Sequence, residues 1–410
     1  MDSSQLYSGA RGRSARGGSE IGERVGAMRR SSEMRRALVL SILVLATSGC
    51  LGMPGSLPPC DSWSADHAIC GLMNPEDLGS LPHGGWVVVS EMHLADPRAG
   101  EEAGPFLPGR LTAIRSRETD GKIERRQLFP NEWAEAATET NRWGDPGCEG
   151  PPSSEDFQPH GIDVGMGPEG RSALAVVTHG FREVIDLFEI AAGSEPALAW
   201  RGCVEMLGEM SANDVALLGD GSLVVTNMIP RLESVGVKAI WIMLKIRLGL
   251  HTGSVLHWSP SGGWSELQKS QASAPNGIAT SADGHVVYVA EWGGGAVYRL
   301  RFAGGLRGGA IPLRDEVAVE GHPSQLTWTA DGRLLVGAQR AGPIKVVSCG
   351  RIEAGGCDIG YSVTSIEVDD LVATKVAEGR GAVSVALEVD DEIWLGVFAG
   401  DSVTRLPKVE

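Results

Sequence analysis

One repeated phrase limits the folds open to this chain more than any other feature. A polar residue opens a short apolar strand, an Asp-Gly turn follows, and a second apolar strand comes next. Three clear copies open at Asn213, Asn276 and Ser324, with turns at Asp220-Gly221, Asp283-Gly284 and Asp331-Gly332. Asp-Gly pairs tolerate the positive φ that tight hairpins need. Repetition at a long period predicts a radial or stacked architecture.

Three further copies of the phrase open at Glu76, His160 and Ser384. After the first copy, the phrase recurs every roughly 50 to 60 residues. Apolar segments at 184–188, 254–258, 296–300 and 344–347 supply later strands for several copies. We therefore predict an all-β protein, a six-bladed β-propeller with four-stranded blades. The alternative, a pair of β-sandwiches, lacks this even spacing with one polar residue at a fixed offset.

The N-terminal region has the pattern of a targeting segment. Basic residues between Arg29 and Arg36 precede an apolar stretch, 37–47, that is too short to span a bilayer. Ser48-Gly49-Cys50 then resembles the end of a bacterial lipoprotein signal with Cys50 as the lipidated residue, although Thr47 replaces the usual Leu. The alternative is an ordinary cleaved secretory signal. Either interpretation places the mature protein outside the cytoplasm, and we expect a lipid-anchored location in the cell envelope, at the outer membrane.

The expected organisation has three parts. Residues 1–49 form a disordered N-terminus and signal peptide, 50–70 a linker, and 71–410 the propeller. Residues 1–49 hold eight Arg and four acidic residues, so their removal changes the formal charge from −16 to −20. Such an acidic body argues against a nucleic-acid partner and is compatible with a bound cation such as calcium.

Six cysteines besides Cys50 fit an oxidising compartment. An even number outside the cytoplasm indicates disulfides, with 15 possible connectivities. The preferred bridges join the close pairs Cys60/Cys70 and Cys349/Cys357, which leaves Cys148 with Cys203. No CxxC pair is present, which argues against a zinc or redox site.

The opening residues of the repeats should meet in the channel, because the innermost strand of each propeller blade lines it. Carboxylate and amide oxygens are the ligands that Ca²⁺ prefers. Glu76, Asn213, Asn276 and Gln325 therefore predict a calcium site. The alternative is that these side chains join neighbouring blades by hydrogen bonds.

From about Glu76 onward the chain resembles the paraoxonases, which are lactonases and arylesterases, and more loosely the gluconolactonase and strictosidine-synthase-like propellers. The phrases that carry the resemblance are 57–60, Glu76-Asp77-Leu78, 157–162, Val176-Val177-Thr178-His179, Asn213-Asp214-Val215, Thr226-Asn227 and 276–291. The resemblance implies two calcium ions and a lactone or aryl ester as the small-molecule substrate.

The resemblance also implies residue roles. Glu76, Asn213 and Asn276, with Ser324 and Gln325 at the remaining position, match ligands of the catalytic ion. Asp77, the carbonyl of Ile162, and Asp214 match ligands of a structural ion. His160 and His179 match a pair that activates water, a role suited to a histidine of near-neutral pKa.

Two departures from the family pattern stand out. Ser324-Gln325 replaces an Asp-Asn pair, which removes one negative charge from the expected calcium shell. The C-terminal cysteine of the animal enzymes is absent, so Cys60 must pair elsewhere. The first departure favours a competing function, a non-catalytic propeller that keeps calcium for stability and binds a ligand or protein. A propeller enzyme with another reaction, of the strictosidine-synthase type, is a third possibility.

The segment 237–250 combines apolar residues with Lys238, Lys245 and Arg247. One interpretation is an amphipathic lid helix over the channel that touches a membrane. The other is a strand or helix buried against a neighbouring loop.

Overall fold

The computed structural model describes residues 54–62, 67–94, 106–118, 120, 122–131, 142–231, 237–306 and 311–408. The predicted signal segment, 1–49, and the lipidation site, Cys50, lie outside these residues. None of the helices within the described ranges has the length and apolar character needed to cross a bilayer.

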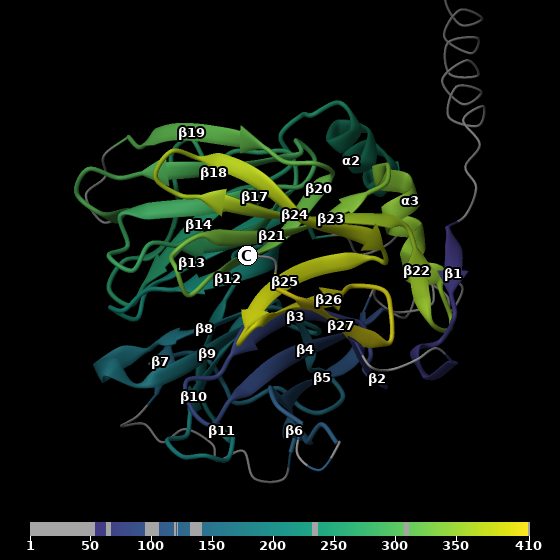
Figure 1. The fold of residues 1–410 in the computed structure, drawn as a ribbon. Coiled ribbons are helices and arrows are strands. Elements are labelled where there is room, and N and C mark those ends of the chain that lie inside the picture. The colour runs from purple at the N-terminus through teal and green to yellow at the C-terminus, as the bar shows by residue number, and fades with distance from the viewer. Residues whose placement is uncertain are drawn as a thin grey trace, which may run out of the picture. The chain divides into compact units, whose positions relative to one another are not determined.

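The described chain forms the predicted six-bladed β-propeller (Figure 1). The first blade contains β3 (Pro75–Ser80), β4 (Trp86–Leu94), β5 (Phe106–Arg115) and β6 (Arg125–Phe129). The second contains β8 (Gln158–Met166), β9 (Ser172–His179), β10 (Val184–Ile190) and β11 (Leu198–Glu205), and the two-residue β7 (Trp143–Gly144) adds a fifth, parallel strand. The third contains β12 (Met210–Leu217), β13 (Leu223–Pro230), β14 (Ser254–Ser259) and β15 (Gly263–Glu266).

The remaining blades follow the same order from the inner to the outer strand. The fourth contains β16 (Pro275–Thr280), β17 (Val286–Glu291), β18 (Ala296–Arg301) and β19 (Leu313–Ala318). The fifth contains β20 (His322–Trp328), β21 (Leu334–Arg340), β23 (Gly360–Glu367) and β24 (Val372–Arg380). The sixth contains β25 (Val383–Val389), β26 (Glu392–Val397) and β27 (Ser402–Pro407), and takes its outer strand from β2 (Ala68–Cys70).

The N-terminal residues therefore close the ring. The expected linker, 50–70, contributes β2 to the sixth blade, and β1 (Gly55–Leu57) pairs with β22 (Gly356–Asp358), a strand from the far end of the sequence (Figure 1). Both segments are only three residues long. Such short strands contain too few alternating apolar and polar residues to be recognised from sequence.

The core lies between neighbouring blades. Each sheet packs its apolar face on the next, and one buried cluster fills each of the six contacts. The first of them contains Trp86, Leu174 and Phe188. The inner strands contact one another in sequence, and the last, β25, contacts the first, β3.

The three preferred disulfides are present: Cys60–Cys70, Cys148–Cys203 and Cys349–Cys357. The predictions of strands at 184–188, 254–258 and 296–300 are confirmed. The prediction of a strand at 344–347 is wrong, because this segment belongs to the short helix α3 (Pro343–Val347). Pro343 occupies the first turn of α3, where its fixed φ favours a helix start.

The segment 237–250 contains the helix α2 (Val237–Arg247). Its inner face buries Ile242 and Ile246 in a cluster with Trp292 and the Cys349–Cys357 disulfide. Its outer face exposes Ile240 and Trp241. The helix is thus partly buried against neighbouring loops, as one interpretation expected, and its contact with a membrane stays a prediction.

Candidate active site and metal centre

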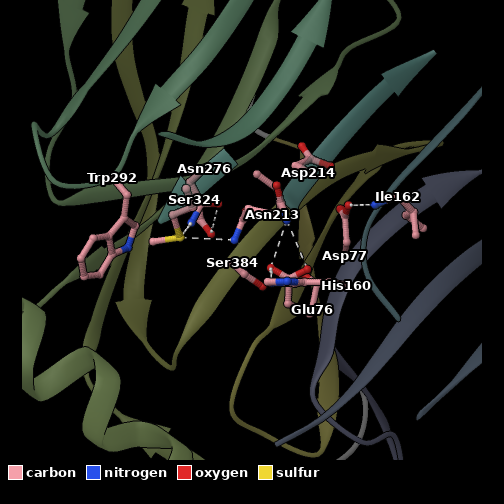
Figure 2. A network of polar contacts seen from close by, with 12 residues as sticks. Glu76, Asp77, His160, Ile162, Asn213, Asp214, Asn276, Trp292, Ser324 and Ser384 are labelled. Carbon is pink, nitrogen blue, oxygen red and sulfur yellow. Dashed lines mark hydrogen bonds and ion pairs between the residues drawn. The ribbon is translucent and has the colours of Figure 1, made fainter. Parts of the chain in front are cut away.

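A β-bulge occurs in every inner strand at the residues that open the repeats. In all six blades the register between the first and second strands shifts at this point, as between Pro275 and Ile278. A bulge leaves extra residues outside the ladder and turns their side chains. The residues freed in this way include Glu76, His160, Asn213-Asp214, Asn276, Ser324-Gln325 and Ser384. The bulges explain why the repeat places polar side chains in one channel (Figure 2).

Glycines allow the bulged strands to approach each other closely. A Cβ on Gly161 would lie 2.5 Å from the carbonyl oxygen of Asn213, and one on Gly277 would lie 2.3 Å from that of Ser324. Backbone atoms of the next blade cannot yield to such an overlap. The glycine after His160 and the glycine after Asn276 are therefore required by the packing of inner strands.

Three aspartates join consecutive blades. The carboxylate of Asp77 accepts the backbone N–H of Ile162 at 2.7 Å, that of Asp163 accepts Leu217 N–H at 2.7 Å, and that of Asp214 accepts Ile278 N–H at 2.8 Å. Ser384 joins the sixth blade to the first, since its hydroxyl donates to the carbonyl of Glu76 at 2.6 Å. Asp77 and Asp214 thus join neighbouring blades, and their role as ligands of a structural ion stays a prediction.

The five residues matched to the catalytic ion are buried. Figure 2 shows four of them close together: Glu76, Asn213, Asn276 and Ser324. The Gln325 amide nitrogen donates to both oxygens of Glu76, at 3.1 and 3.2 Å. The Ser324 hydroxyl donates to Oδ1 of Asn276 at 3.2 Å. Ser324-Gln325 therefore reaches the same centre as Glu76, Asn213 and Asn276.

Negative charge is concentrated here, and no Lys or Arg of the described residues forms an ion pair with Glu76, Asp77 or Asp214. Burial and the charge of Asp77 raise the pKa of Glu76 well above its usual range. Burial raises the pKa of Asp77 to about 7, and burial with the charge of Asp77 raises the pKa of Asp214 strongly. In the described part of the chain, the group within ion-pair distance of these carboxylates is His160, whose Nε2 lies 3.6 Å from Glu76 Oε1.

Two buried oxygens in this centre have no hydrogen-bond partner, Oδ1 of Asn213 and Oε1 of Gln325. An unsatisfied buried acceptor is costly and calls for a ligand. Across the described residues, no cluster of three or more His, Cys, Asp or Glu side chains is arranged to hold a metal ion. A calcium shell also uses amide, hydroxyl and carbonyl oxygens, which such clusters leave out. The residues present therefore fit calcium as a hard, oxygen-seeking cation.

The two histidines form one hydrogen-bonded chain. Nδ1 of His160 lies 2.9 Å from Nε2 of His179, whose Nδ1 lies 2.8 Å from Oε1 of Glu183. Burial raises the pKa of Glu183, but His179, the backbone N–H of Ala212 and the charge of Arg231 together outweigh it, so the pKa lies below its usual value. The Glu183 carboxylate therefore accepts from Nδ1–H of His179.

The Glu183 carboxylate determines which ring nitrogens of His179 and His160 carry protons. In the neutral state of the pair, Nε2 of His179 accepts from Nδ1–H of His160, which leaves the lone pair of His160 on Nε2. Burial, followed by the charge of His179, lowers the pKa of His160 well below its usual value. His160 is thus a neutral base whose side chain remains 13% exposed.

Two residues of the centre had not been predicted from the sequence. Glu183 lies in the turn between β9 and β10, and Met228 lies on β13 beside the two asparagines. A carboxylate four residues after His179 was the available signal for Glu183. Two surface cavities, of about 280 and 330 Å³, lie elsewhere and are lined by none of the residues of this centre.

The fold and the centre define a β-propeller protein with one polar site in its channel. A family model described as arylesterase matches residues 138–397. The chain belongs to the arylesterase family, and its membership indicates a hydrolase of esters or lactones.

Among solved structures, a putative gluconolactonase is 16% identical with a TM-score of 0.44, over 87% of this chain and 99% of that one. A gluconolactonase from Xanthomonas campestris is 16% identical with a TM-score of 0.41, over 84% and 99%. Virginiamycin B lyase from Staphylococcus aureus, in a catalytically inactive form, is 15% identical with a TM-score of 0.44, over 83% and 98%. Similarity at this level carries no functional information. No protein with curated annotation matches the sequence.

Proposed function

We propose that the protein hydrolyses lactones or aryl esters in a calcium-dependent reaction, with His160 as the base that activates water. The observation that carries this proposal is the chain Glu183–His179–His160, which ends beside the buried oxygens of the calcium centre. Membership of the arylesterase family supports the reaction class.

Glu76, Asn213, Asn276, Ser324 and Gln325 would hold the catalytic ion. Asp77, the carbonyl of Ile162, and Asp214 would hold a structural ion. When bound, the catalytic ion supplies a Lewis acid that polarises the substrate carbonyl and stabilises the oxyanion.

The histidine pair transfers the proton of the attacking water. Glu183 fixes His179, and His179 fixes His160 with its lone pair on Nε2. His160 Nε2 takes a proton from water as the water oxygen bonds to the carbonyl carbon. When the bond to the alkoxy oxygen breaks, that oxygen receives the proton from His160, and the products are a carboxylic acid and an alcohol, joined in one molecule for a lactone.

The contact between Gln325 and Glu76 favours a second candidate, a non-catalytic propeller. The amide donates to both carboxylate oxygens, so it partly satisfies the charge that a cation would otherwise satisfy. This candidate predicts ligand or protein binding without turnover.

The test is a panel of γ-lactones, δ-lactones and aryl esters, assayed with calcium and with EDTA. We expect turnover with calcium, and a loss of at least about 100-fold in His160→Gln, because general-base catalysis contributes about that much or more. His285→Gln, on an exposed turn of the fourth blade, is the matched control and should keep full activity. Absence of turnover across the panel, with calcium bound, would exclude the enzyme and favour the second candidate.

The cell-envelope location and the lipid anchor at Cys50 stay predictions. The three disulfides support an oxidising compartment.

A further inference from the structure

A thioether lies between the two asparagines of the calcium centre. Sδ of Met228 is 3.5 Å from Nδ2 of Asn213 and 3.9 Å from Nδ2 of Asn276. Figure 2 shows both contacts as dashed lines from the amide nitrogens to a yellow sulfur atom. One side chain of the third blade therefore contacts ligand candidates from the third and the fourth blades.

The chemistry of the thioether distinguishes the two ends of an amide. Sulfur in Met is a weak acceptor and has no donor, so it can pair with N–H but not with C=O. When the nitrogen of an Asn side chain faces the sulfur, its oxygen must face away. Oδ1 of Asn213 is indeed buried without a hydrogen-bond partner, and Oδ1 of Asn276 faces the Ser324 hydroxyl.

Met228 is itself held in place from two sides. Its backbone carbonyl accepts the Thr252 hydroxyl at 3.0 Å. Its side chain packs on the apolar cluster of α2, which contains Ile242, Ile246 and Trp292. A soft sulfur also competes poorly for a hard cation, so it does not replace the oxygens as a ligand.

We propose that Met228 is a positioning residue that turns the amide oxygens of Asn213 and Asn276 toward the cation. This inference rests on the calcium centre of the proposed function. It predicts that removal of the sulfur weakens calcium binding while the fold stays intact.

The experiment measures calcium binding to the purified protein by isothermal titration calorimetry, and melting temperature with and without calcium. Met228→Leu keeps apolar volume and removes the acceptor, a change that cores tolerate well. We expect its calcium dissociation constant to rise about three- to tenfold, since two weak hydrogen bonds are lost. Met228→Val, a second acceptor-free variant, should show a similar loss. Met228→Gln restores an acceptor and should bind within about twofold of the parent.

Met243→Leu is the matched control, because Met243 packs on the same cluster from α2. In the absence of calcium, Met228→Leu and Met243→Leu should melt alike, and only Met228→Leu should show a smaller increase when calcium is added. Parent-like affinity in Met228→Leu, or equal losses in the Leu and Gln variants, would refute the role of Met228 and leave the proposed function standing. A parent protein that binds no calcium would refute the calcium centre together with this inference.

Discussion

Asp186 shows how burial of a single carboxyl group ties stability to pH. It lies on β10, away from the predicted calcium centre, and is 1% exposed. Its Oδ1 accepts the indole N–H of Trp200 at 2.9 Å. Burial raises the pKa of Asp186 to about 6, because its hydrogen bonds do not replace the lost hydration of the charged form.

The pKa of Asp186 predicts a specific pH dependence. The folded-state pKa exceeds the unfolded value, so this group stabilises the fold at low pH. Its contribution is lost as pH rises from about 4 to about 6, by about 3 kcal/mol in the free energy of unfolding. Asp186→Asn should remove this loss in urea denaturation at pH 4 and pH 7. Asp283→Asn, on an exposed turn, is the control and should not flatten the pH dependence of the free energy of unfolding. An unchanged pH dependence in Asp186→Asn would contradict the raised pKa of Asp186.

At the scale of elements, the segment before the second blade joins two blades. Its strand β7 pairs with β11, and Cys148 is bonded to Cys203 of the same strand. Within this segment, Asp145 accepts the backbone N–H of Glu205 at 3.1 Å and the indole N–H of Trp258 at 3.2 Å. The disulfide thus secures a segment that connects the second and third blades.

Removal of this disulfide should be more costly than removal of the shortest one. Cys148 and Cys203 are 55 residues apart, whereas Cys349 and Cys357 are 8 apart. A longer closed loop restricts the unfolded chain more, so the Cys148→Ser/Cys203→Ser protein should lose about 2–4 kcal/mol in the free energy of unfolding. The Cys349→Ser/Cys357→Ser protein should lose less. Denaturant unfolding measures both, and the reverse order would show that native contacts outweigh loop entropy.

At the scale of the whole propeller, stability is coupled to the channel. Glu76, Asp77 and Asp214 come from the first and third blades, and burial raises the pKa of all three. The charge of Asp77 raises the pKa of Glu76 further, and the charges of Asp77 and Glu76 raise that of Asp214. Their mutual repulsion opposes ring closure unless a cation or protons compensate for it. Calcium should therefore stabilise all the blades together.

Calcium removal tests this coupling. With calcium at about 100 times its dissociation constant, binding to the folded state adds about 2.7 kcal/mol. EDTA should then lower the melting temperature by roughly 4 °C for a chain of this size. Magnesium added in place of calcium serves as the control. It should restore less of the melting temperature, since it binds poorly to flexible sites with many oxygen ligands. A melt unchanged by EDTA would count against both calcium sites.

The propeller could be predicted because its signal is local and repeated. Each copy carries a turn such as Asp283-Gly284 and two apolar strands, and each inner strand starts with a polar residue. The disulfides were also accessible, since Cys60/Cys70 and Cys349/Cys357 are close in sequence. That Asn213, Asn276 and Ser324 meet could be predicted, because they occupy equivalent repeat positions and inner strands converge in a propeller.

The sequence by itself determined the number of blades, the polar residue that opens each inner strand, and the supply of oxygen ligands. The tertiary structure decided how these groups are used. Glu183 fixes the histidine pair, Met228 lies between Asn213 and Asn276, and β2 closes the ring, all through contacts with residues outside their own strand. A pattern of alternating residues shows which side chains face the channel, but the partners across it depend on the register between strands and on the bulges that turn them.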